Sequence, residues 1–198
     1  MKNKSINIVV LSETKKKLKG TKDIDDYTLI YSGVEQTSRA NKGVAIMVDN
    51  IWKRKILSYS YVIERIMTIR FKIEWGHSIV IGVYAPEEGK PEETEHFYKK
   101  LQKELDKYNK SDHVIIAGDL NARVGNIPIN KIVGCYGEDK LNENGHELRN
   151  FVTQNDFKIT YTFFRKKQIG LHKYKWSARG FKSLIDYLIV AEPGRLVV

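Results

Sequence analysis

The sequence predicts one mixed α/β domain that spans residues 1–198. Short apolar runs of strand length alternate with polar loops, and two other segments carry their apolar residues at helical spacing. Hydrophobic residues make up 41% of the chain and aromatic residues 11%, which is enough for a sizeable core. No repeat, low-complexity tract or linker interrupts the sequence. We therefore expect a single fold in which strands are joined by hairpins as well as by crossover connections.

The expected strands are the apolar or alternating runs at residues 6–11, 43–48, 66–73, 78–84, 113–117, 158–164, 172–176 and 184–190. Trp75-Gly76-His77 separates the third run from the fourth, so these two are predicted to form an antiparallel hairpin.

Two helices are expected, at residues 92–108 and 145–154. The first places Phe97, Leu101, Leu105 and Tyr108 on one face, and the second does the same with Leu148, Phe151 and Val152.

The formal net charge of +10 suits a polyanionic partner, most commonly a nucleic acid. The alternative is a lysine-rich composition that serves solubility, because net charge alone locates no patch. Cys135 is the only cysteine, so it cannot form an internal disulfide, and a reducing compartment is expected rather than secretion. The apolar run at residues 6–11 is too short for a signal-peptide core or a membrane span.

Two candidate site residues follow or end apolar strands. Glu13 lies just beyond the run at residues 6–11, and a carboxylate at a strand end suits Mg²⁺, which prefers one or two carboxylates with water and phosphate oxygens. Tyr84 ends the run at residues 78–84, just before Ala85-Pro86, where a phenol can hydrogen-bond a phosphate oxygen. The alternatives are a surface glutamate in a turn and a half-buried strand aromatic.

The strongest motif is Gly118-Asp119-Leu120-Asn121, which follows a buried strand. In an extended chain, a spacing of two places the side chains of Asp119 and Asn121 on one face. An aspartate can accept a proton from an attacking water or bind a metal, and an asparagine can orient that water or a phosphate. The alternative is a polar turn after a strand.

Asp186 heads the last apolar run, where a buried carboxylate needs a partner such as a histidine. The alternative is a lone acid at a strand edge. Ser111-Asp112-His113 looks like a catalytic triplet, but its position before a strand indicates a cap and loop. His146 and His172 have no cysteine or histidine neighbours at the spacing of a zinc site.

Taken in order, these motifs resemble the endonuclease/exonuclease/phosphatase superfamily, and within it the endonuclease domains of non-LTR retrotransposons, above all the craniofacial development protein 2-like group. The shared strings are Ser-Glu-Thr-Lys, Tyr-Ala-Pro, Gly-Asp-Leu-Asn-Ala, Asn-Glu-Asn-Gly and Thr-Phe-Phe-Arg-Lys-Lys, at residues 12–15, 84–86, 118–122, 142–145 and 162–167. The resemblance runs from about residue 6 to about residue 190.

The resemblance implies a two-sheet α/β sandwich of the DNase/exonuclease III type and Mg²⁺-dependent hydrolysis of DNA phosphodiesters, with Mn²⁺ as the alternative metal. Glu13 corresponds to the metal-binding glutamate, with Asp119 as a second metal ligand, and Tyr84 to the tyrosine near the scissile phosphate. Asp119 and Asn121 correspond to the pair that handles the nucleophilic water and the phosphate, and Asp186 to the aspartate that supports a final histidine. We expect a monomer that binds DNA, with no membrane association, in an intracellular location that is nuclear if the domain is functional.

The sequence also departs from the family pattern. The family begins with a strand that carries an asparagine, followed by a helix, and ends with a Ser-Asp-His strand after the Ile-Asp-Tyr motif; this sequence begins after the first two and stops at Val198 without the last. We therefore expect a domain truncated at both ends and weak or absent activity. Lys175 stands where the family usually has a phosphate-contacting threonine, so it is a candidate substrate-binding residue. Two alternatives remain open: a phosphatase of the same superfamily, and a non-catalytic module that binds nucleic acid or protein.

Overall fold

The computed structural model describes residues 6–109, 111–165, 174–176 and 181–191. The chain divides into two compact units. The first unit contains residues 1–84 and 103–118, and the second contains residues 85–102 and 119–198. The single domain that the sequence predicts stays a prediction.

One sheet of the first unit has four antiparallel strands in the order β1-β4-β3-β2. β1 (Ile8–Ser12) and β4 (Val44–Asp49) confirm two of the expected strands. β2 (Lys19–Ile24) and β3 (Tyr27–Ser32) were not expected. β2 is polar and almost fully exposed, so it has no apolar pattern to reveal it, and its backbone pairing with β3 makes it a strand.

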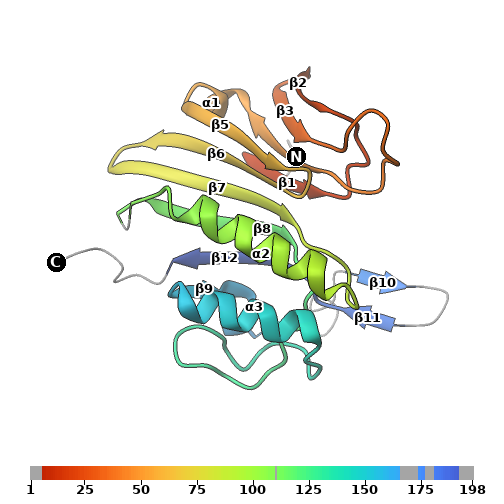
Figure 1. Ribbon diagram of the computed structural model, residues 1–198. Helices are drawn as coiled ribbons and strands as arrows, with labels where there is room; N and C mark the ends of the chain where they lie inside the picture. Colours follow the sequence, from red (N-terminus) through yellow and green to blue (C-terminus); the bar gives the residue numbers. More distant parts are fainter. Residues whose placement is uncertain (1–5, 110, 166–173, 177–180, 192–198) are drawn as a thin grey trace. The chain divides into compact units, whose positions relative to one another are not determined.

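The other strands of the first unit follow the order β5-β6-β7-β8 (Figure 1). β6 (Ile66–Ile73) and β7 (Gly76–Tyr84) form the predicted antiparallel hairpin, in which Ile66 pairs with Val83. β5 (Ile56–Ile63) was not expected, because its serines and tyrosines interrupt the apolar run and its residues Leu57, Ser58 and Tyr59 are exposed. β8 (His113–Asp119) confirms the strand that leads to the Gly-Asp motif.

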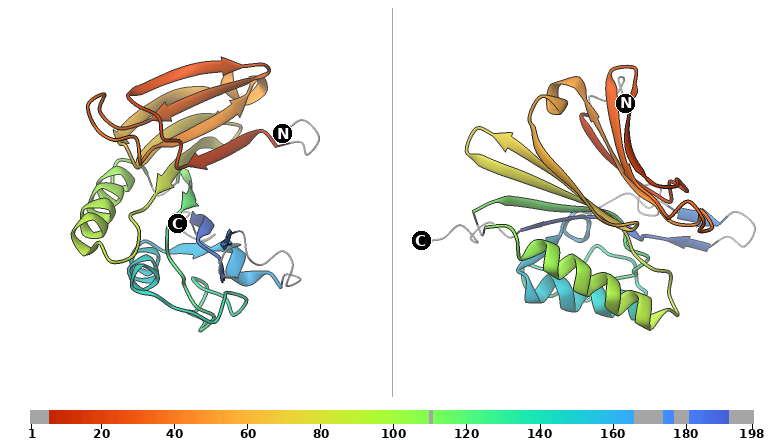
Figure 2. Two further views of the ribbon diagram at one scale, coloured as in Figure 1. Left: turned by 90° about the vertical axis from the view of Figure 1, so that its right-hand side faces the viewer. Right: turned by 45° about the horizontal axis from the view of Figure 1, so that its top comes forward.

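The core of the first unit lies between its two sheets, as a two-sheet sandwich requires. β3 and β4 contribute Ile30, Val44, Ile46 and Val48, and β6 and β7 contribute Met67, Ile69, Phe71 and Val80. Figure 2 shows the two sheets lying against each other. The short helix α1 (Asn50–Lys53) closes one end, because the Trp52 ring meets Phe71 edge-on at 5.4 Å.

Two helices pack together in the second unit. α2 (Pro91–Leu105) and α3 (Glu143–Gln154) confirm both predicted helices, although the last turn of α2 belongs to the first unit. The rings of Tyr98 and Phe151 lie 5.2 Å apart, and Gln102 and Asn155 exchange two amide hydrogen bonds of 3.1 and 2.8 Å.

The strands of the second unit are short. β12 (Asp186–Ala191) pairs antiparallel with β9 (Phe157–Ile159), and β10 (Tyr174–Trp176) pairs with β11 (Phe181–Ser183). No helix in the part of the chain that the structure describes is long and apolar enough to cross a membrane.

The prediction of a strand at residues 158–164 is mostly wrong. A 3₁₀ helix at Thr160–Phe163 replaces most of it. The Thr162 hydroxyl donates to the Ile159 carbonyl at 2.7 Å and accepts from the Gly134 backbone N–H at 2.7 Å. Because a threonine hydroxyl can hydrogen-bond nearby backbone groups, it stabilises this turn against continued strand pairing.

Candidate active site

Glu13 and Tyr84 meet in the first unit. β1 ends at Ser12, so Glu13 is the exposed residue that follows it, with a left-handed backbone φ of 52°. Tyr84 is the last residue of β7, and only 3% of it is exposed. Its hydroxyl donates to Oε1 of Glu13 at 3.1 Å, although 71 positions separate the two residues. Two strand ends that the sequence singled out separately are thus brought into contact.

Arg65 also contacts Tyr84. This buried arginine donates from Nη1 to the Tyr84 carbonyl at 3.2 Å, and its guanidinium lies 5.0 Å from the ring centroid. The cation–π contact favours one ring position, and the phenol is then aimed at the carboxylate of Glu13. Sequence reasoning missed Arg65, because a single arginine beside a strand carries no local signal of such a role.

Gly118 brings two strands of the first unit into close contact. Its φ is 140°, and a Cβ at this position would lie 2.0 Å from the Val83 carbonyl oxygen. Only glycine fits there, because both the conformation and the space exclude a side chain. The residue before Asp119 is therefore held against the residue before Tyr84.

Asp119 and Asn121 form a tight turn at the start of the second unit. The Asn121 backbone N–H donates to Oδ1 of Asp119 at 2.8 Å, and Asn121 has a left-handed φ of 46°. The expected extended geometry is therefore wrong. β8 ends at Asp119, and its carboxylate closes an Asx-type turn, a conformation that aspartate and asparagine tolerate well. The turn still keeps the two residues together.

Ala85 of the Tyr-Ala-Pro motif also contacts this turn within the second unit. The Ala85 backbone N–H donates to the Asp119 carbonyl at 2.8 Å, and the Asn121 side-chain amide donates to the Ala85 carbonyl at 2.9 Å. The amide of Asn121 is therefore oriented by the backbone before it meets any substrate.

Asn144 holds the same turn from α3. This buried side chain donates from Nδ2 to the carbonyls of Pro86 and Asn121, both at 3.0 Å. Asn142 caps α3, because its Oδ1 accepts from the Gly145 N–H at 2.8 Å. The Asn-Glu-Asn-Gly string supported the family resemblance in the sequence, but no role was assigned to it. Its two asparagines tie a helix start to the Asp119 turn.

Asp186 begins β12 and is half-buried. The segment around it lies along the Asp119 turn, since the Leu120 N–H donates to the Ile185 carbonyl at 2.9 Å and the Tyr187 hydroxyl donates to the Ala122 carbonyl at 3.0 Å. Burial, and then the charge of nearby Glu138, raises the pKa of Tyr187 above its ordinary value, so the hydroxyl stays protonated and remains a donor. The sequence-predicted Asp186 thus comes near the Asp119 turn.

A buried ion pair supports this arrangement. Arg123 donates to both oxygens of the buried Glu138, from Nε at 2.9 Å and from Nη2 at 2.6 Å. The Glu138 carboxylate raises the pKa of Arg123 through these hydrogen bonds, and it also accepts from the Leu184 N–H at 3.4 Å. The pair joins the loop after Asn121 to the segment before Asp186, and sequence reasoning did not find it.

Two further predictions have separate outcomes. Lys175 lies in β10, where it pairs with Lys182, but its side chain is outside the described residues, as is His172.

Asp112 confirms the cap interpretation, because its Oδ2 accepts from the Asn109 N–H at 3.1 Å and its Oδ1 lies 3.3 Å from Nδ1 of His77.

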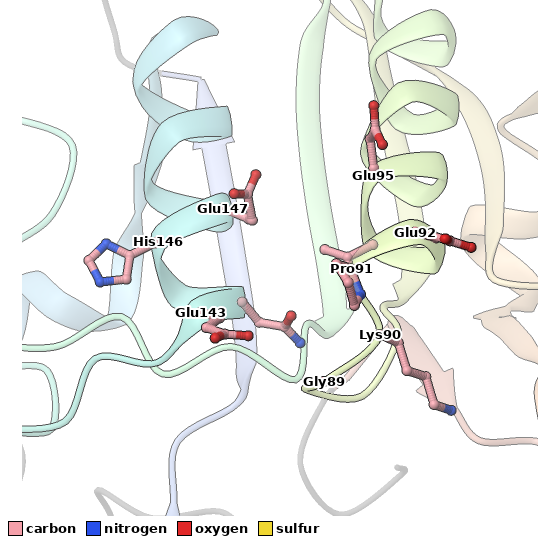
Figure 3. Close-up of a pocket in the computed structure, with 10 residues that line it drawn as sticks. Gly89, Lys90, Pro91, Glu92, Glu95, Glu143, His146 and Glu147 are labelled. Carbon is pink, nitrogen blue, oxygen red and sulfur yellow. The ribbon is translucent and has the colours of Figure 1, made fainter.

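A cavity of about 690 Å³ lies at the N-terminal ends of α2 and α3 in the second unit (Figure 3). Four glutamates line it: Glu92, Glu95, Glu143 and Glu147. Their negative charge opposes a phosphate, so this cavity does not fit a nucleic-acid backbone. The residues that the sequence predicted for catalysis do not line it.

The donors available for a metal favour Mg²⁺ bound mainly by non-protein oxygens. Within the described ranges, no group of three or more histidines, cysteines and acidic residues could hold a metal ion. Mg²⁺ needs only one or two carboxylates, because water and substrate phosphates fill its other positions. The hydrogen bond from Tyr84 uses Oε1 of Glu13, which leaves Oε2 of this exposed side chain as a ligand. The residues present therefore fit such an ion.

Comparisons with known proteins give the same fold. The chain is 33% identical to craniofacial development protein 2 of Bos taurus over 98% of its own residues, and it spans 33% of that protein's length. An AP endonuclease from Leishmania major superposes with a TM-score of 0.69 at 15% identity, covering 99% of this chain and 72% of that chain. The endonuclease domain of TRAS1, a telomere-specific non-LTR retrotransposon, gives 0.61 at 14% identity, covering 85% and 68%. No protein-family model matches the sequence.

Proposed function

Because this chain is a homologue of craniofacial development protein 2 with the fold of the endonuclease/exonuclease/phosphatase superfamily, we propose that it hydrolyses phosphodiester bonds of DNA in a metal-dependent reaction. The hydrogen bond between Tyr84 and Glu13 is the observation that carries the proposal. It places a carboxylate suited to Mg²⁺ beside a phenol that can contact a phosphate, at two strand ends of this fold.

Each residue has a proposed role. Glu13 holds Mg²⁺, with Mn²⁺ as a substitute, and the bound ion neutralises charge that develops on the phosphate. Tyr84, held by Arg65 and Glu13, hydrogen-bonds a phosphate oxygen. Asp119 accepts the proton of the attacking water, and Asn121 hydrogen-bonds that water or the phosphate.

The proposal depends on the preorganisation of the Asn121 amide. Since the Ala85 carbonyl already accepts one of its N–H bonds, the plane of the amide is set before substrate arrives. Donors that are fixed in advance stabilise a transition state at little reorganisation cost. The segment around Asp186 supports the turn through the Ile185 carbonyl and the Tyr187 hydroxyl, and Lys175 is a proposed phosphate contact.

The test is nicking of supercoiled plasmid by the purified chain with Mg²⁺, with Mn²⁺ and with EDTA. We expect slow nicking with either metal and none in EDTA, because the sequence predicts weak activity. Glu13→Gln and Asp119→Ala should each lower the rate by about 10²–10³-fold, a range typical for removing one catalytic group. The double variant should be hardly slower than either single variant, since residues that act as a unit are not additive.

Glu74→Gln is the matched control, because it removes an exposed carboxylate of the first unit that has no role in the proposal. Nicking that persists in both Glu13→Gln and Asp119→Ala would overturn the assigned roles. A folded chain that hydrolyses phosphomonoesters but not DNA would indicate the phosphatase alternative. A folded chain that binds DNA but never cleaves it would indicate the non-catalytic module.

A further inference from the structure

The segment at residues 15–22 concentrates positive charge directly after Glu13. It contains five lysines and no acidic residue, and we call it the lysine segment. It runs from the loop after β1 into the first four residues of β2, the outermost strand of its sheet (Figure 1). Most of its residues are exposed. Net charge alone locates no binding surface, but this local concentration does.

The backbone of the lysine segment is fixed rather than free. The Leu18 N–H donates to the Val34 carbonyl at 2.7 Å, the Gly33 N–H to the Leu18 carbonyl at 2.8 Å, and the Val34 N–H to the Lys16 carbonyl at 3.2 Å. Lys15 and Leu18 have left-handed φ values of 51° and 60°. Such conformations are strained for residues with a side chain and persist only where surrounding bonds enforce them.

Gly33 allows this close approach. A Cβ at Gly33 would lie 2.2 Å from the Lys16 carbonyl oxygen. Only glycine therefore lets the backbone segments at residues 16 and 33 approach so closely. The lysine segment is therefore preorganised, and a ligand that binds it does not bear the cost of ordering a loop.

The lysine ammonium groups meet neutral partners. Lys16 Nζ lies 4.6 Å above the Tyr31 ring, and Lys19 Nζ lies 5.7 Å above the Tyr61 ring. Lys17 Nζ donates to the Gln36 carbonyl at 2.7 Å. No carboxylate of the described residues forms an ion pair with these three lysines. Their charges stay uncompensated, while the aromatic faces hold two of them in place.

We propose that the lysine segment binds the sugar–phosphate backbone of duplex DNA, beside the bond that the Glu13 site cleaves. This inference rests on the proposed function, because it assigns the contact surface for the same substrate. Fixed lysines with aromatic and carbonyl partners position a chain of phosphates without reading base sequence. The surface therefore supplies affinity that depends on salt and not on sequence.

The test measures binding of the whole chain to a fluorescent DNA duplex by anisotropy, in EDTA, over a series of salt concentrations. The test variant is Lys16→Gln/Lys17→Gln/Lys19→Gln. Each phosphate contact contributes about −0.9 to the slope of log K against log salt concentration. We expect the slope of the triple variant to be shallower by about 2–3. Substituting arginine at the same three positions should restore the slope.

The matched control removes the same charge elsewhere. Lys55→Gln/Lys72→Gln/Lys103→Gln changes three exposed lysines, and Lys55 stacks on Trp52 at 4.6 Å, so a cation–π contact is lost there as well. Circular dichroism confirms that each variant is folded. Equal slopes for the two triple variants would overturn the proposal, as would a loss of binding to anionic phospholipid vesicles with no loss of binding to DNA.

The two proposals fail separately. Because binding is measured in EDTA, it does not require cleavage. A shallower slope in a chain that never nicks plasmid would support the DNA surface and reject the nuclease activity. Metal-dependent nicking together with an unchanged slope would support the activity and reject the surface.

Discussion

Replacing Asn144 by alanine should destabilise the protein, because its side chain satisfies two carbonyls at once. Nδ2 donates to the Pro86 and Asn121 oxygens at 3.0 Å, and only 5% of Asn144 is exposed. Leaving a buried acceptor without its donor costs about 1–2 kcal/mol, so two acceptors give a loss of about 2–4 kcal/mol in the free energy of unfolding. For a chain of this size, each kcal/mol lowers Tm by about 2–4 °C.

The measurement is urea unfolding followed by circular dichroism, with thermal unfolding as a second measure. Asn150→Ala is the control, because Asn150 lies on the same helix but is exposed, and its loss should change stability by less than about 0.5 kcal/mol. Asn144→Asp should be worse than alanine, because a carboxylate would face two carbonyl oxygens. The reasoning fails if Asn144→Ala and Asn150→Ala unfold at the same urea concentration.

Two other substitutions test the supports of the candidate site. Gly118→Ala should prevent folding or lower the free energy of unfolding by more than about 3 kcal/mol, because its Cβ would lie 2.0 Å from the Val83 oxygen. An alanine variant with the wild-type melting curve would show that β8 does not pass as close to β7 as described. Glu138→Gln should lower the free energy of unfolding in urea by about 2–3 kcal/mol, because a glutamine amide has only one oxygen to accept the two hydrogen bonds from Arg123. Glu95→Gln breaks an exposed pair and should leave the urea midpoint almost unchanged, so equal losses would contradict the distinction.

The sequence predicted those elements that carry their own pattern. The apolar runs of β1, β4, β6, β7 and β8 are visible because both faces of these strands are largely covered. The two long helices are visible because their apolar residues recur at helical spacing. β2 was missed because it packs too little apolar surface to show a period. The stretch from Thr160 was predicted to be a strand, but the hydrogen bond from the Thr162 hydroxyl to the Ile159 carbonyl stabilises a 3₁₀ helix there.

For the candidate site, the sequence by itself determined the residue types and their places at strand ends. It singled out Glu13, Tyr84, Asp119 and Asn121, and the family resemblance came from the order of their motifs. The net charge of +10 indicated a polyanionic partner, but it located no patch on the molecule.

Only the tertiary structure decided which of these groups touch. The bond between Tyr84 and Glu13 spans 71 positions, and the stacking of Arg65 on Tyr84 depends on the strand pairing that places one beside the other. The hydrogen bond from the Asn144 side chain to the Asn121 carbonyl likewise joins residues that lie 23 positions apart. Local patterns report what each segment buries, whereas partners for hydrogen bonds are chosen when the segments pack, so the contacts could not be derived from any one stretch of sequence.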